Sequence, residues 1–295
     1  MISPELYKKI QQFHFRTRFL ADDLFAGQYV SAFKGKGMEF AEVREYMPGD
    51  DVRDMAWNVT ARFGRPFIKV HAEERELTVM VLVDVSGSQA FGTRKRFKRE
   101  LAAEVAGLLA FVAVRTNDRV GAILFSDRVH KFIPPKKGPG HVWRLIMEVF
   151  ADDTPAGGTD LAAALNYLNR VVRRRAVVFC VSDFLLPEYG KDVWVAMGLA
   201  ARKHDLTAVR VKDPAERVLP PGGLVRLADP ETGRVTVADF SDRRLRERFS
   251  REMERRDMEF KDLISKSGVD LVELSTDGSV LKPLTAYFRR REARR

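Results

Sequence analysis

The hydrophobic pattern in the middle and C-terminal parts of the chain alternates between strand-like runs and helix-like stripes. Continuous apolar or β-branched runs, typical of strands covered on both faces, occur at 77–83, 176–181 and 206–211. Helical spacing of apolar residues is found at about 95–115, at 140–151, from 159 onward and at 190–203. Strands alternating with helices predict a doubly wound α/β fold, with a mainly parallel sheet and helices on both faces.

Further elements extend this pattern. Residues 120–125 and 130–133 are predicted as two strands joined by a short turn, and 269–274 as another strand before a closing helix that runs to Arg291. The helix at 95–115 is expected to bury one stripe, formed by Phe97, Leu101, Val105, Leu108 and Val112. A β-hairpin insertion is predicted near 222–240, followed by a long amphipathic helix. Its apolar face carries Leu245, Phe249, Met253, Phe260 and Ile264.

The first 75 residues lack the strand–helix alternation. A helix is predicted over 6–24, and after it short apolar pieces are separated by glycines, by prolines and by the turn sequence Pro48-Gly49-Asp50-Asp51. We therefore divide the chain into an irregular, β-leaning N-terminal region at 1–75 and an α/β domain at 76–295.

Composition and charge narrow the functional classes. The 295 residues are 45% hydrophobic and 31% charged, as in ordinary globular proteins. No run approaches the ~18 consecutive apolar residues of a membrane span, and the N-terminus lacks a signal-peptide layout. The only cysteine, Cys180, lies within an apolar run and is expected to be an inert core residue. These features predict a cytoplasmic protein.

The net charge of +10 favours acidic partners. Many of the basic residues alternate with acidic ones, as on a solvated helix face, and no zinc knuckle, RNP motif or helix-turn-helix pattern is present. Binding to nucleic acid is therefore kept only as a lesser alternative.

Oxygen-bearing side chains gather where the predicted strands end. Asp84, Ser86 and Ser88 follow the first buried strand, Thr159 opens a later helix, and Asp183 ends the next buried strand. Because ligands of open α/β sheets bind beyond the carboxyl ends of the strands, these segments are expected to converge. Carboxylates and hydroxyls suit a hard cation that keeps some water, so Mg²⁺ or Mn²⁺ is the expected ion.

In that order and context, the five residues resemble the metal-ion-dependent adhesion site (MIDAS) of a von Willebrand factor A domain. The segments around Arg44, Asp51, Trp57 and Arg62, and the tail around 229–233, are similar to the bacterial domain-of-unknown-function-58 family. The resemblance covers nearly the whole chain. It implies a non-enzymatic protein–protein interaction module whose metal binds an acidic residue of a partner, and an adaptor or co-chaperone role for a MoxR-type AAA+ ATPase.

A metal-dependent hydrolase or phosphotransferase is the alternative from another class. Phosphatases that use an aspartate after the first strand need a second carboxylate two residues later, but here that residue is Ser86. The sequence places no convincing lysine near the site, and none of its five histidines is expected in the converging loops. A Ser86 nucleophile would then lack a base. We therefore expect no enzymatic activity.

Overall fold

The computed structural model describes residues 23–33, 42–70, 76–93, 96–150, 157–186, 189–229 and 233–294. Of the helix predicted over 6–24, residues 6–22 lie outside these ranges. None of the described helices combines the length and the apolar character that crossing a membrane requires.

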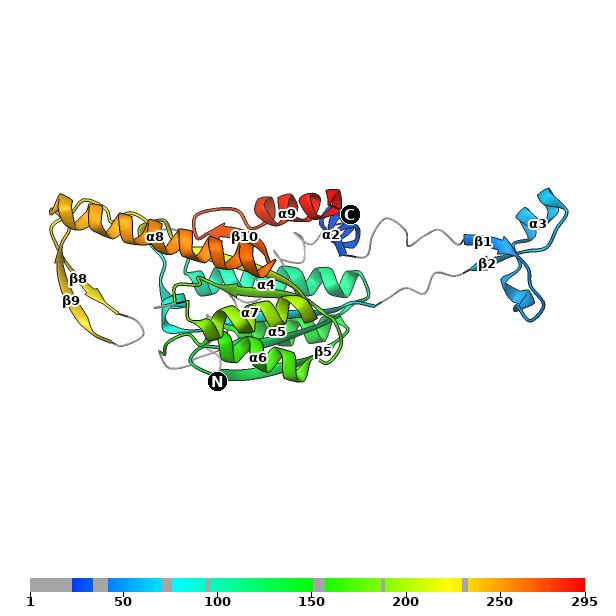
Figure 1. Cartoon of the computed structure of the whole chain (residues 1–295), viewed down its shortest axis with the longest axis horizontal. Coiled ribbons are helices and arrows are strands. Elements are labelled where there is room, and N and C mark those ends of the chain that lie inside the picture. Colours follow the sequence, from blue (N-terminus) through cyan, green and yellow to red (C-terminus); the bar gives the residue numbers. More distant parts are fainter. Residues whose placement is uncertain are drawn as a thin grey trace.

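A six-stranded sheet forms the centre of the molecule (Figure 1). Its strands, in chain order, are β3 (Thr78–Asp84), β4 (Arg119–Phe125), β5 (Val129–Lys136), β6 (Val177–Ser182), β7 (Asp205–Lys212) and β10 (Asp270–Ser275). They are arranged in the order β10-β7-β6-β3-β4-β5, and every neighbouring pair is parallel except β4 with the edge strand β5. The predicted fold class is thereby confirmed. Since the chain passes from β3 to β4 on one side and later to β6 on the other, β3 and β6 flank the topological switch point.

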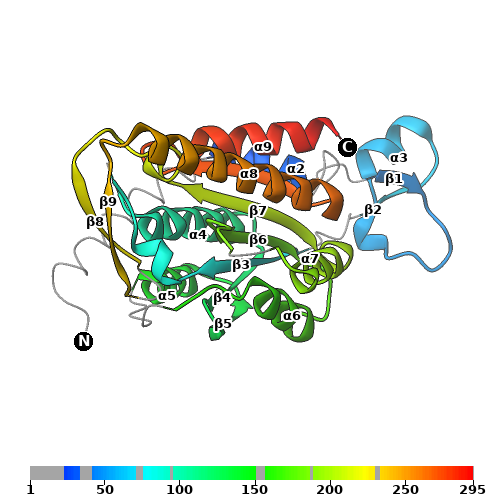
Figure 2. The same ribbon diagram turned by 60° about the vertical axis from the view of Figure 1, so that its left-hand side comes forward.

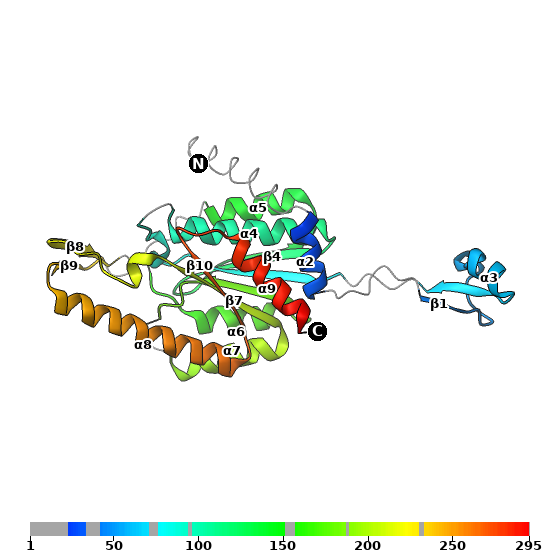
Figure 3. The same ribbon diagram turned by 90° about the horizontal axis from the view of Figure 1, so that it is seen from above.

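Helices cover both faces of the sheet. The helices are α2 (Asp23–Phe33), α4 (Lys98–Arg115), α5 (Pro139–Phe150), α6 (Leu161–Val171), α7 (Lys191–Lys203), α8 (Arg243–Ser267) and α9 (Leu281–Ala293). Side chains of α2, α4, α5 and α9 share one hydrophobic core with Val79, Val81 and Val83 of β3. Those of α6, α7 and α8 share a second core with Met80 and Leu82, the alternate positions of the same strand. Figure 3 shows the two helical layers on opposite sides of the sheet.

Helix α2 belongs to the main core, although it precedes the predicted boundary at residue 75. Phe25, Tyr29 and Phe33 are buried and pack on Phe288 of α9, with ring centroids 5.1, 6.0 and 5.8 Å away. Two segments at opposite ends of the chain therefore close one face of the sheet together.

Helix α4 begins one residue after the first member of the predicted stripe, and it buries more than that stripe. Leu101, Val105, Leu108 and Val112 are buried as expected, but Phe97 precedes the helix and is 50% exposed. Lys98 lies one helical turn before Leu101 and is fully buried. Every residue from Leu101 to Ala113 is buried, so the prediction of a single buried stripe is wrong: other elements cover this helix on all sides.

Two small units stand beside the α/β body. The first joins β1 (Glu42–Glu45) and β2 (Phe67–Val70) as an antiparallel pair around a 3₁₀ turn, η1 (Val52–Asp54), and helix α3 (Trp57–Phe63); Figure 1 shows it at a distance from the sheet. The second is the antiparallel hairpin of β8 (Leu224–Ala228) and β9 (Val235–Asp239), which lies within the predicted insertion. Figure 2 shows this hairpin beyond the carboxyl ends of the strands, next to the start of α8.

Candidate functional site at the carboxyl ends of β3 and β6

Asp84 occupies the end of β3, next to the end of β6. The Ser182 hydroxyl donates to one carboxylate oxygen at 2.6 Å, and the Ser86 backbone N–H donates to the other at 2.9 Å. Asp84 is completely buried. Burial, and secondarily the charge of Asp183, raise the pKa of Asp84 to about 7, although hydrogen bonds from Ser182 and Ser86 act in the opposite direction. A positive charge nearby would strongly favour the ionised form of this buried carboxyl group.

A chain of oxygens joins the loop after β3 to the loop after β6. The hydroxyls of Ser86 and Ser88 are 3.1 Å apart, and Ser88 Oγ donates to Asp183 Oδ2 at 2.8 Å. The other Asp183 oxygen accepts from the Leu185 N–H at 3.1 Å. Four of the five predicted ligand residues therefore lie together.

The turn after Asp183 is held in an unusual backbone conformation. Phe184 has a φ of 53°, in the left-handed region that large side chains rarely adopt. Its ring is buried 4.9 Å from that of Phe260, and its N–H donates to Ser182 Oγ at 3.0 Å. Packing and hydrogen bonding fix this turn, and with it the direction of the neighbouring carboxylate.

Thr159, the fifth predicted residue, lies in the loop before α6. This loop reaches the cluster through its backbone, because the Gly157 carbonyl accepts from the Gly87 N–H at 3.4 Å. Thr159 is partly exposed. Asp160 caps α6 by accepting from the Ala163 N–H at 2.8 Å. The loop that carries Thr159 thus meets the cluster at Gly157, two residues earlier, while Asp160 is committed to the helix.

The structure places a lysine in the site, contrary to the expectation from the sequence. Lys98 Nζ donates to Asp183 Oδ2 at 2.6 Å and also to Glu216, which ends the 3₁₀ turn η3 (Pro214–Glu216) after β7. Burial, the largest influence, lowers the pKa of Lys98, but the two carboxylates together outweigh it and raise the pKa above its ordinary value. The side chain is therefore a buried ammonium. The sequence signal that could have indicated this burial is the position of Lys98, three residues before the apolar Leu101.

The oxygen spacing in the cluster fits a small divalent cation. In an octahedral Mg²⁺ site with metal–oxygen distances of about 2.1 Å, neighbouring ligand oxygens lie about 3.0 Å apart. The Ser86–Ser88 and Ser88–Asp183 separations of 3.1 and 2.8 Å are close to that value, although ordinary hydrogen bonds between oxygens have the same length. Across the described ranges, no group of three or more His, Cys, Asp or Glu side chains could hold a metal. The donor set is instead rich in hydroxyls, and Asp84, Ser86, Ser88 and Asp183 are the residues that could hold the ion.

A histidine lies nearer to the site than the sequence indicates. His130 Nε2 is 2.6 Å from the Ser126 hydroxyl, and the Ser126 carbonyl accepts from the N–H of Asp160 at 2.7 Å. Asp127 approaches the same nitrogen, Nε2, at 3.6 Å. In a catalytic triad, the carboxylate would bind the opposite ring nitrogen, and Ser126 is also fully buried. These three residues therefore do not have the geometry of a nucleophile with its base.

A cavity of about 390 Å³ opens beside Asp183. It is lined by side chains from β7, η3, α8 and β10, among them Glu216, Lys212, Asp257 and the exposed Met258. Lys212 Nζ binds Asp257 at 2.8 Å and Glu273 at 2.5 Å. The nearby hairpin exposes several apolar side chains, namely Leu224, Leu227, Val235 and Val237. The edge of the sheet that holds the oxygen cluster thus also offers charged and apolar contact surface.

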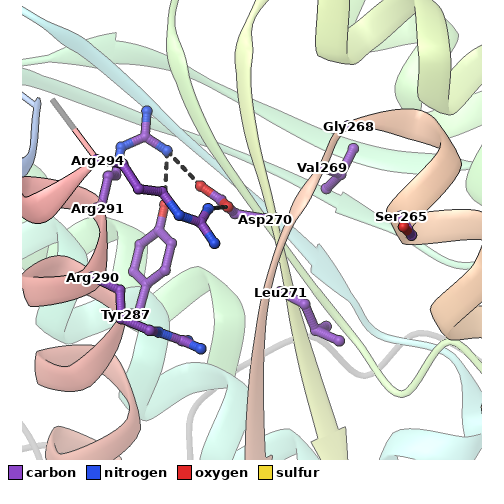
Figure 4. A pocket seen from close by; sticks show the side chains of 9 residues that line it. All are labelled: Ser265, Gly268, Val269, Asp270, Leu271, Tyr287, Arg290, Arg291 and Arg294. Atoms are coloured by element: carbon purple, nitrogen blue, oxygen red, sulfur yellow. Dashed lines mark hydrogen bonds and ion pairs between the residues drawn. The ribbon is translucent and has the colours of Figure 1, made fainter.

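A second hollow, of about 460 Å³, lies at the opposite edge of the sheet, where β10 begins (Figure 4). Its guanidinium groups are largely committed to carboxylates. Arg291 binds Asp205 and, at 2.9 Å, Asp270, while Arg294 binds Asp270 at 3.0 Å. This ion-pair network ties α9 to β7 and β10 and is structural.

Comparison with protein families and with known proteins gives consistent relatives. The model of the family described as "Protein of unknown function DUF58" matches residues 42–259. Uncharacterized proteins of Mycobacterium tuberculosis and Mycobacterium bovis are each 32% identical over 296 aligned residues, which cover 98% of this chain and 92% of theirs.

Solved structures give more distant likenesses. An aerotolerance-related membrane protein from Bacteroides fragilis is 16% identical, with a TM-score of 0.48 over 74% of this chain and all of that one. The SpRpn10 VWA domain is 12% identical, with a TM-score of 0.40 over 72% of this chain and 95% of the other. At this distance they add nothing to what the strand order itself establishes.

Proposed function

The chain belongs to the DUF58 family, and from this membership and the geometry at the carboxyl edge of the sheet we propose that it is a divalent-metal-dependent protein-interaction module. The observation that carries the proposal is the hydrogen-bonded cluster at the ends of β3 and β6. The Ser86 N–H donates to Asp84, the Ser86 and Ser88 hydroxyls are in contact, and Ser88 donates to Asp183. These residues hold Mg²⁺ or Mn²⁺, with Thr159 completing the set from the neighbouring loop.

Recognition follows from the shortage of negative charge around the ion. Two aspartates and neutral hydroxyls leave a divalent cation electrophilic, so the ion supplies a binding position for a carboxylate from outside. The chain's own residues fix that position: Ser182 and the Ser86 N–H orient Asp84, and the Phe184 turn orients Asp183. The cavity beside Asp183 and the exposed apolar side chains of the hairpin then contact residues around the partner's acidic group.

A MoxR-type AAA+ ATPase is the proposed partner, and an adaptor or co-chaperone is the proposed role. The support is the family resemblance together with a site suited to capture an acidic side chain. We propose binding without catalysis, because the hydroxyls in the cluster bond to one another and to carboxylates, and His130 bonds to a buried serine. The cytoplasmic location stays a prediction.

The first experiment is calorimetric titration of Mg²⁺ and of Mn²⁺ into metal-free protein. We expect the wild type to bind one ion and Asp84→Ala to bind none, because the substitution removes a buried anionic ligand. Asp262→Ala makes the same chemical change on the exposed surface of α8 and is expected to bind like the wild type. Equal binding by wild type and Asp84→Ala would place the ion elsewhere and refute the site.

The second experiment measures binding of a purified MoxR-type ATPase by interferometry, in Mg²⁺ and in EDTA. We expect association only with Mg²⁺, and its loss in Asp84→Ala. Binding that persists in EDTA would show that the ion plays no part in recognition.

A further inference from the structure

Lys98 places a permanent positive charge inside the candidate metal site. We propose that Lys98 is a built-in cation that holds Asp183 in place when no metal is bound and that a divalent ion must partly displace, so that Lys98 sets the metal affinity of the site. This inference rests on the proposed metal site, because it assigns a role to a residue of this chain toward that ion.

The hydrogen bonds around Asp183 show why the two cations compete. Asp183 Oδ2 accepts from Lys98 Nζ at 2.6 Å and from Ser88 Oγ at 2.8 Å, so both of its lone pairs are in use. A metal that binds this oxygen at about 2.1 Å must replace one of the two donors and would lie less than about 5 Å from Nζ. If Ser88 turns to offer its own oxygen to the ion, Lys98 remains as a like charge close by.

The surroundings of Lys98 prevent it from simply moving into water. The side chain is 1% exposed, enclosed at the start of α4, and its other partner, Glu216, is only 19% exposed. Like charges at such a distance repel strongly where water is excluded. The ammonium therefore lowers the affinity of the site for a second cation, and its existing contact with Glu216 can persist when a metal takes its place at Asp183.

The same charge is expected to stabilise the metal-free protein. Asp84, Asp183 and Glu216 are three carboxylates in one buried region, and without a cation they would destabilise the fold. Lys98 pairs with Asp183 and with Glu216, so the ammonium offsets part of the negative charge there, and a divalent ion would offset more. Lys98 is thus the positive charge that stays at Asp183 when the metal is absent.

Substitution of Lys98 by methionine tests this directly, with Mg²⁺ and Mn²⁺ as the probes in calorimetry. We expect Lys98→Met to bind either ion at least ten-fold more tightly than the wild type, and to gain a larger increase in melting temperature from the metal. Lys212→Met is the matched control. Lys212 also lies between two carboxylates, at the edge of the same cavity, but it contacts none of the proposed ligands. We expect its affinity to stay within about three-fold of the wild type.

A second variant guards against misfolding of metal-free Lys98→Met. Lys98→Met combined with Glu216→Gln removes one charge of each sign, and it too is expected to bind metal more tightly than Glu216→Gln alone. Unchanged or weaker binding in both Lys98→Met proteins would overturn the inference and make Lys98 a positioning residue for Asp183.

The outcomes also separate this inference from the metal site itself. If the wild type binds metal and Asp84→Ala does not, the site stands whatever Lys98→Met does. If neither the wild type nor Lys98→Met binds Mg²⁺ or Mn²⁺, both the site and the role of Lys98 are refuted.

Discussion

Buried ionisable side chains occur outside the candidate site as well, and His204 is the clearest. It ends α7 with 1% of its surface exposed, and its Nδ1 accepts from the Ala176 N–H at 3.3 Å. Burial, with smaller contributions from Lys203 and Arg175, lowers the pKa of His204 to about 4. The folded protein therefore keeps this imidazole neutral.

This lowered pKa predicts a pH dependence of stability. Between about pH 6.5 and pH 4 the unfolded chain takes up a proton at His204 that the folded chain refuses, so the free energy of unfolding falls as the pH falls, by up to about 3 kcal/mol in total. Above pH 6.5 His204 contributes no slope. Urea unfolding at several pH values should show a shallower dependence for His204→Gln than for the wild type. Parallel curves for the two proteins would contradict the prediction.

Residues of the site differ in how far the sequence could indicate them. Asp84 and Asp183 could be placed together because each ends a strongly apolar strand, and parallel strands share one carboxyl edge. Lys98 was missed because Phe97 offered an apolar alternative one position earlier, and only packing decides which of the two enters the core. Glu216 could not be found, because its contact depends on the path of the turn after β7 and on the reach of its side chain.

At the scale of elements, α2 and α9 form a joint layer that the sequence did not indicate. The α2 segment carries Gly27, Gln28 and Ser31 among its aromatic residues, so its apolar stripe is weak. Its helical conformation is stabilised chiefly by packing against α9, as is usual for short helices. By contrast, the central strands could be predicted because each is apolar over its whole length.

The contact between α2 and α9 gives a prediction for stability. Phe288 is fully buried and contacts the rings of Phe25, Tyr29 and Phe33. Phe288→Ala removes this contact and leaves a cavity, so we expect the free energy of unfolding to fall by about 3–5 kcal/mol. Phe63→Ala makes the same change in α3, where the ring is 64% exposed, and should cost less than about 1 kcal/mol. Chemical denaturation measures both. Similar losses for the two variants would show that α2 is not part of the cooperative core.

For the molecule as a whole, two continuous cores on either side of the sheet provide most of the stability. Metal removal is therefore expected to have a modest effect on the wild type, because the metal-free site already contains Lys98. At the size of this chain, 1 kcal/mol shifts a melting temperature by about 2–4 °C, and we expect EDTA to lower it by only a few degrees. Calorimetric or fluorescence melts in Mg²⁺ and in EDTA test this. A collapse of the folded state on chelation would show that the metal is an obligatory structural part.

The edge strand β5 has a consequence for how this protein can associate. Among the residues that the structure describes it pairs only with β4, its register is interrupted twice, and it contains Pro134 and Pro135 between lysines at positions 131 and 136. Prolines cannot donate to a neighbouring strand, and edge lysines oppose the approach of another sheet. This border of the sheet is thereby closed to strand addition and to amyloid-like stacking. When many copies of the protein are synthesised close together, this edge of the sheet therefore does not promote their aggregation.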